Sequence, residues 1–221
     1  MPSNNYPIIA REGWFFLGLL GLLVIFCFYY EDIAITALAV IVLVTFLFLL
    51  RDPRQEVPSS PLAIVSPVYG SIQSIDEIVD PWLGRLSRRI RIKMSLLDVY
   101  SLRSPIEGKV VNQWTLRPDG NQTRRQFAFL VRGDEGDEVI VVINLHFLSA
   151  LLFRFYVHSG ERLGHGQRCG YLYFGGLVDI LLPQNCSIKV EQSVHIASGS
   201  GVLAQLVHNE GASVIRETEN A

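Results

Sequence analysis

The sequence is short of the residues from which most metal centres and disulfide frameworks are built. Its 221 residues contain three cysteines and five histidines, with no Cys-x-x-Cys pair and no two histidines at metal-ligand spacing. We therefore expect no metal site and no disulfide scaffold, and the few thiols favour a reducing compartment. The net charge of −2 gives no electrostatic basis for binding nucleic acid.

Charge is also nearly absent from the first 50 residues, which hold four charged side chains, whereas the rest of the chain holds 18 basic and 18 acidic ones. Residues 14–30 and 33–50 are two uncharged apolar runs. Each approaches the ~20 residues that an α-helix needs to cross a bilayer. We expect residues 1–56 to form a membrane anchor, a hairpin of two helices with a very short turn.

The charges around these two runs predict how the hairpin is oriented. Arg11 precedes the first run, Arg51 and Arg54 follow the second, and only Glu31 and Asp32 lie between them. Because cytoplasmic flanks carry the excess of basic residues, both ends of the hairpin are expected in the cytoplasm. This places the remainder of the chain on the cytoplasmic side of the cell membrane.

Residues 57–205 are rich in short β-like segments, and residues 206–221 form a polar tail that we expect to be flexible. A weak repeat, Ser-Pro-x-x-Gly-x-(Ile/Val), occurs at Ser66–Ile72 and again at Ser104–Val110, 38 residues later. Coincidence is one interpretation of the repeat. The other is a Pro-Gly turn that opens a strand twice, in a mostly β domain that is a duplicated β-sandwich or barrel.

Individual strands and one helix can be predicted from local patterns. Alternation of charged and apolar residues predicts a strand at Arg89–Met94, and Phe127–Val131 and Val139–Asn144 flank a charged turn, as hairpin arms do. Residues 145–156 are the one plausible helix of this region. Two further strands, 171–174 and 177–182, are expected on either side of Gly175-Gly176, where a hairpin turn is the simplest interpretation.

The segment around these two glycines resembles the processing site of the phosphatidylserine decarboxylase family, in its short bacterial and archaeal branch. The family pattern is Phe-Gly-Ser-x-Val-Asp, followed by an apolar strand and proline. This chain has Phe174, Gly175, Val178, Asp179 and Pro183 in place, with Gly176 at the serine position. Residues 6–14 and 51–54 also resemble the flanks of the family's membrane segment.

The resemblance implies a specific chemistry for that serine. In the family, its hydroxyl attacks the preceding glycine carbonyl, and elimination then splits the chain and leaves a pyruvoyl cofactor at the new N-terminus. The pyruvoyl ketone forms a Schiff base with phosphatidylserine and accepts electrons as carbon dioxide leaves. Gly176 has no side-chain oxygen, so this processing cannot start there.

Two more family positions differ. An aspartate of a Ser-Pro-x-Asp-Gly turn corresponds to Tyr69, and a histidine of a Met-Ser-x-Phe-Asp-Val-His motif corresponds to Tyr100. A tyrosine with an ordinary pKa near 10 is a poor general base at neutral pH. We therefore expect no catalytic residues and no cofactor, in a non-catalytic relative that binds lipid or a partner protein. The alternative is an active decarboxylase with an unusual processing site; a third is another lipid-linked activity in the old pocket.

Partners are predicted from one basic strip and from the family. On the predicted strand, Arg89, Arg91 and Lys93 share one face and the intervening residues share the other. A solvated face is the plain interpretation of this strip, and contact with anionic phospholipid headgroups is the functional one. Since active family members assemble, a homo-oligomer or a mixed oligomer with an active homologue is also expected.

Overall fold

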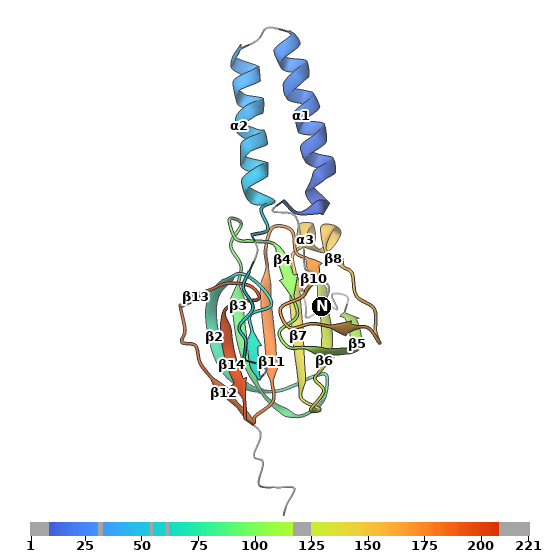
Figure 1. The fold of residues 1–221 in the computed structure, drawn as a ribbon, viewed down its shortest axis with the longest axis vertical. Coiled ribbons are helices and arrows are strands. Elements are labelled where there is room, and N and C mark those ends of the chain that lie inside the picture. Colours follow the sequence, from blue (N-terminus) through green and yellow to red (C-terminus); the bar gives the residue numbers. More distant parts are fainter. Residues whose placement is uncertain (1–8, 31–32, 54, 61, 117–124, 208–221) are drawn as a thin grey trace, which may run out of the picture.

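The computed structural model describes residues 9–30, 33–53, 55–60, 62–116 and 125–207, and Figure 1 shows a helical hairpin standing on a β domain. A short turn, η1 (Arg11–Gly13), leads into α1 (Trp14–Tyr29), and α2 (Ile33–Leu49) runs back beside it. The expected hairpin is present. The predicted turn at residues 31–32 and almost all of the predicted tail lie outside the described residues.

The helix hairpin has the properties of a membrane anchor. The helical stretch Arg11–Tyr29 has 19 residues and a mean hydropathy of 1.9, enough in length and composition to cross a bilayer, and α2 is an apolar helix slightly below that length. Only 6 % of the α1 window is buried. A core helix of a soluble protein would instead be mostly buried, so the exposed apolar surface of the pair favours a lipid environment.

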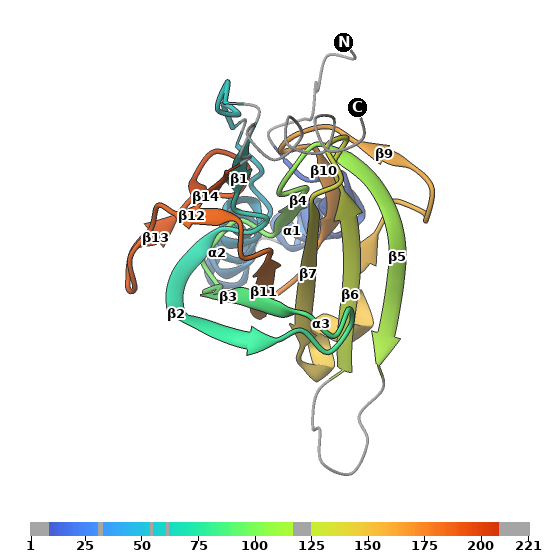
Figure 2. The ribbon, with the colours of Figure 1, turned by 90° about the horizontal axis from the view of Figure 1, so that it is seen from below.

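The β domain contains one long sheet and two short ones. The long sheet has the order β13-β2-β3-β11-β7-β6-β5-β9, and it curls round on itself (Figure 2). The short sheets have the orders β1-β14-β12 and β4-β10-β8. The strand bounds are β1 Ala63–Val65, β2 Gly70–Val79, β3 Leu86–Lys93, β4 Ser101–Arg103, β5 Gly108–Leu116, β6 Arg125–Arg132, β7 Glu138–Leu145, β8 Arg154–Phe155, β9 Arg162–Leu163, β10 Arg168–Tyr171, β11 Leu177–Leu182, β12 Cys186–Ile188, β13 His195–Ile196 and β14 Val202–Leu206.

The repeated Ser-Pro-x-x-Gly motif is a structural repeat. In the first copy the Ser66 hydroxyl donates to the Val68 carbonyl over 2.6 Å, and in the second Ser104 donates to Ile106 over 2.7 Å. Each motif ends with the glycine that begins a long strand, Gly70 of β2 or Gly108 of β5. The second copy therefore repeats both the turn and the strand of the first.

Close backbone packing explains why each copy ends in glycine. A Cβ on Gly70 would lie 2.5 Å from the Lys93 carbonyl oxygen, and one on Gly108 would lie 2.3 Å from that of Arg132. In each case the obstructing carbonyl belongs to the last residue of the strand that follows, Lys93 of β3 or Arg132 of β6. Together with the mirrored strand order of the long sheet, this confirms the predicted duplicated, mostly β architecture.

The core lies inside the curl of the sheet. On β3, Ile90 and Ile92 are fully buried while Arg89, Arg91 and Lys93 lie on the other face, as the alternation predicted. Aromatic and β-branched side chains of β6, β7 and β11 fill the same interior, among them Phe129, Ile143 and Ile180. The hairpin arms β6 and β7 pair antiparallel around the charged turn, which confirms that prediction.

Three local predictions were wrong, two in extent and one in strand pairing. The first strand before the glycine pair ends at Tyr171, because Phe174 and Gly175 have φ angles of 61° and 69°, outside the extended region. The glycine pair does not join hairpin arms either: β10 pairs with β4 and β8, whereas β11 pairs with β3 and β7. The predicted helix is shorter than expected, since α3 covers only Phe147–Leu152 before the chain enters β8.

Candidate functional site

The turn at Gly175-Gly176 connects the short sheet that contains β10 to the centre of the long sheet. Both glycines are buried, and the Gly176 carbonyl accepts a hydrogen bond from the Met94 amide over 3.0 Å. A Cβ on Gly175 would lie 3.1 Å from the Met94 Cβ, and the positive φ of Gly175 further favours glycine there. The turn is thus held tightly between the end of β3 and the end of β7.

Gly176 differs from Gly175 in what surrounds it. Its backbone is not in the left-handed region, and an added Cβ would lie 3.2 Å from the Asn144 carbonyl oxygen and 3.7 Å from Leu172 Cδ2. The second distance is ordinary packing, and the first requires a shift of a few tenths of an ångström. A small side chain could therefore occupy the position, and the shape of the turn does not by itself require glycine.

Tyr100 is buried beside this turn and serves as a structural hydrogen-bond donor. Its hydroxyl donates to the Leu96 carbonyl over 2.6 Å, and its ring lies 5.9 Å from that of Tyr171 and 6.4 Å from that of Phe174. Burial raises the pKa of Tyr100 above its ordinary value, and the nearby charge of Asp98 raises it further. A neutral phenol whose proton is held in a hydrogen bond to a carbonyl cannot serve as a base at neutral pH.

Tyr69 lies beside a histidine and a carboxylate that the sequence did not bring together. The ring of His195 packs edge-on against Tyr69 with centroids 5.0 Å apart, and its Nε2 lies 3.5 Å from Asp98 Oδ1. The other oxygen of Asp98 accepts the Ser95 amide over 2.6 Å, which orders the loop after β3. Sequence analysis missed His195 because 97 positions of chain separate it from Asp98, and no local motif marks the pair.

The predicted basic strip is in place, but much of its charge is neutralised. Arg91 forms a bidentate ion pair with the buried Asp179 over 2.7 and 2.9 Å, and Arg89 pairs with Asp76 over 2.9 Å. Lys93 is exposed, and the ion pairs found in the described part of the chain do not include it. Asp179, from the family-like motif, therefore secures β11 to β3.

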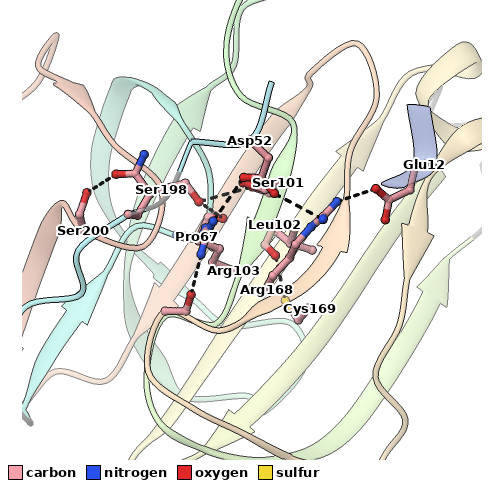
Figure 3. A network of polar contacts seen from close by, with 12 residues as sticks. Glu12, Asp52, Pro67, Ser101, Leu102, Arg103, Arg168, Cys169, Ser198 and Ser200 are labelled. Carbon is pink, nitrogen blue, oxygen red and sulfur yellow. Dashed lines mark hydrogen bonds and ion pairs between the residues drawn. The ribbon is translucent and has the colours of Figure 1, made fainter. Parts of the chain in front are cut away.

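A buried ion network joins the base of the hairpin to the β domain (Figure 3). Asp52, which follows α2, lies between two arginines, 3.3 Å from Arg103 Nη2 and 3.4 Å from Arg168 Nη1. Arg168 also reaches Glu12, which precedes α1, over 2.8 Å, and the Tyr156 hydroxyl donates to the same carboxylate. Since Arg168 begins β10, both ends of the hairpin are held to the strand that leads into the Gly175-Gly176 turn.

The remaining ionisable groups of the described residues are scattered. Among the described residues, no three histidine, cysteine or acidic side chains are grouped so that they could hold a metal ion. The three cysteines are free, and burial raises the pKa of the Cys169 thiol, which makes it unreactive. His165, a half-buried histidine between two glycines, has a pKa lowered by burial. It lies near Ala63 of β1, in the short sheet that does not contain the turn.

The fold and the site together define the class of protein: a duplicated β domain attached to an apolar helix hairpin, with a buried and tightly held turn beside an aromatic cluster. A sequence model described as phosphatidylserine decarboxylase matches residues 43–204. Proteins named phosphatidylserine decarboxylase proenzyme are similar over nearly their full length. That of Nitrosomonas eutropha is 31 % identical, with 90 % of this chain and 96 % of the relative aligned, and that of Nitrosomonas europaea is 32 % identical, with 92 % and 98 % aligned.

The chain belongs to the phosphatidylserine decarboxylase family. Membership places the chain in phospholipid metabolism, and family members use a covalently bound pyruvoyl group. A third relative, the proenzyme of Paraburkholderia xenovorans, is 27 % identical over 208 residues. The resemblance first found in the motif around Gly176 is thus confirmed for most of the chain.

Proposed function

We propose that this chain is a membrane-anchored family member that does not process itself and that holds anionic phospholipid without decarboxylating it. The observation that carries the proposal is Gly176. The pyruvoyl group is made from the serine itself: elimination expels the upstream carboxylate and leaves dehydroalanine, whose Cβ becomes the methyl group and whose nitrogen is released as ammonia on hydrolysis. A hydroxyl supplied by another residue could break the chain but could not provide those atoms.

The surroundings of the turn support the same proposal. At the two other family positions, the Tyr100 hydroxyl donates to the Leu96 carbonyl and Tyr69 packs against His195. Neither side chain offers a carboxylate or an imidazole to assist proton transfer. The space at Gly176 would nevertheless admit a small side chain. The frame of the site is retained, and the groups that react in the family are replaced.

The test is the intact mass of the purified full chain. We expect a single species of 24.8 kDa, with no second N-terminus and no carbonyl that reacts with hydrazide reagents. Two fragments divided at the Gly175-Gly176 bond, or a carbonyl-bearing terminus, would refute the proposal.

The full-length similarity to proenzymes supports a second candidate, an active decarboxylase that processes at an unusual position. The two candidates separate in one assay: the full chain in vesicles containing phosphatidylserine, made in cells or extracts without another decarboxylase. The non-catalytic proposal predicts no ethanolamine lipid and no carbon dioxide. Product from an uncleaved chain would require a carbonyl from outside the chain, and product from a cleaved chain would establish the second candidate.

Lipid binding is proposed to centre on Lys93 within the predicted basic strip. Lys93 is exposed at the end of β3 nearest the hairpin, whereas Arg89 and Arg91 already pair with carboxylates. Near an anionic surface each basic side chain contributes about 1 kcal/mol. In full-length protein in vesicles, Lys93→Ala should weaken phosphatidylserine binding more than Arg89→Ala does, with titrations in phosphatidylcholine as the baseline. Equal effects of the two substitutions would contradict this assignment.

A further inference from the structure

The end of the β domain nearest the hairpin carries an unusual set of exposed apolar side chains. Phe147 is 86 % exposed, more than any large apolar side chain of α1 or α2. Leu148 and Leu151 of the same short helix α3 are also well exposed. The set is completed by Leu96 and Leu97 in the loop after β3 and by Phe174 before the glycine pair. We name these six residues the apolar rim.

Helix α3 presents three of its five apolar side chains outward, whereas a helix packed on a soluble domain turns its apolar face inward. Its buried residue is Ser149, whose hydroxyl donates to the His146 carbonyl over 3.1 Å. Phe147, Leu148 and Leu151 point away from the domain, into solvent if no other molecule covers them. Contiguous exposed apolar surface of this kind marks a contact with another molecule or with a membrane.

The position of the rim identifies the occupant. Arg51, which follows α2, donates to the Leu97 carbonyl over 3.1 Å, so the loop after β3 touches the hairpin base. The chain that leaves α3 reaches Glu12, just before α1, through the Tyr156 hydroxyl. Figure 1 shows α3 directly beneath the foot of α1. A bilayer that surrounds the hairpin would meet the rim first.

Charge at this end agrees with a lipid surface. Arg11 and Arg154 are exposed close to the rim. The carboxylates of Glu12 and Asp52 are instead turned inward and paired with arginines, and that of Asp98 is buried next to His195. Basic residues beside apolar ones, with the acidic groups withdrawn, suit the headgroup region of an anionic leaflet.

We propose that the apolar rim inserts into the interfacial layer of the bilayer that holds the hairpin. The insertion brings the Gly175-Gly176 turn to headgroup level, since the turn lies between the two halves of the rim. Gly175 approaches the Ser95 carbonyl on one side, and Gly176 approaches the Asn144 carbonyl, three residues before α3, on the other. This inference rests on the membrane placement of the hairpin in the proposed function.

The test uses the full chain in vesicles, with an environment-sensitive fluorophore on a single added cysteine. All probes are introduced into a Cys27→Ala parent. The other two cysteines, Cys169 and Cys186, are buried and should not react in the folded protein. The rim probes are Leu97→Cys and Leu148→Cys. The matched control is Val79→Cys, which is equally apolar and exposed (65 %, against 61 % for Leu97) at the far end of β2. Ten residues of strand separate that end from the rim end, roughly 30 Å.

The rim probes should shift their emission to the blue. They should also lose most of their fluorescence intensity when the vesicles contain lipids that carry a quencher near the headgroup. The Val79→Cys probe should do neither. A probe at Ile25→Cys reports on the hairpin itself. If that probe is quenched and the rim probes are not, this inference fails alone; if the Ile25→Cys probe is not quenched either, the membrane part of the proposed function fails as well.

A charge substitution supplies a second readout. Phe147→Glu should weaken the quenching at the Leu97→Cys probe by lifting the whole end of the domain from the lipid. Val79→Glu should leave that quenching unchanged. Both positions are strongly exposed, so neither substitution should affect folding, and unaltered urea unfolding checks this. Quenching that persists in the Phe147→Glu variant would overturn the concerted insertion.

Discussion

Replacing Asp52 with asparagine tests whether the buried ion network holds the hairpin to the β domain. Asp52 is 1 % exposed, and the side chains of Arg103 and Arg168 on either side are 6 % and 4 % exposed. Removing one partner from a buried pair costs about 3–5 kcal/mol, because a charge is left buried without compensation. Arg168 keeps Glu12 and Arg103 keeps the Gly166 carbonyl, which places the expected loss near the lower end, about 3 kcal/mol.

The assay is urea unfolding of the full chain in micelles, followed through the packed Trp82–Trp114 pair of the β domain in a Trp14→Phe background. The control is Asp76→Asn, which breaks a partly exposed pair with Arg89 and should change the unfolding midpoint much less than Asp52→Asn does. Adding Arg103→Met to Asp52→Asn should recover stability, because the uncompensated charge is removed. If the double variant is no more stable than Asp52→Asn alone, the electrostatic explanation is wrong.

Three further outcomes are expected. Gly176→Ser alone should leave the chain uncleaved on a denaturing gel, because Tyr100 cannot act as a base; cleavage would show that the hydroxyl suffices. Burial raises the pKa values of Tyr100 and Tyr171 above 10.0, so the unfolded chain ionises first and the fold should lose stability as the pH rises past 10.0. A urea unfolding midpoint that does not fall as the pH rises past 10.0 would argue against this. Gly108→Ala should lower the free energy of unfolding by about 1–3 kcal/mol, because the added Cβ would clash with the Arg132 carbonyl. An unchanged melting temperature would contradict the close approach.

Sequence periodicity located much of the fold because its signals are local. The alternation in β3 and the repeated Ser-Pro-x-x-Gly motif depend on residues within a few positions of one another, and both appear in the structure as expected. Strand partners could not be found in this way. Whether β10 turns back on β11 depends on β3, β4 and β7, which are distant in sequence and compete for the same edges.

The site was predicted where a motif marked it and missed where geometry alone made it. Gly175, Gly176 and Tyr100 lie together, as the family resemblance implied. The ion network was missed, although a lone acid beside each apolar run, Glu12 and Asp52, could have signalled it. The outward face of α3 was missed as well, because an apolar helix is ordinarily assigned to the core.

The double attachment of the hairpin restricts how far the β domain can travel. A domain attached through a flexible linker can sample a wide volume and reach a neighbouring membrane. Here Glu12 and Asp52, one beside each helix, both bind Arg168. The domain is therefore held at the base of the hairpin, and in the membrane placement proposed above the lipid within its reach belongs to the leaflet from which its own helices emerge.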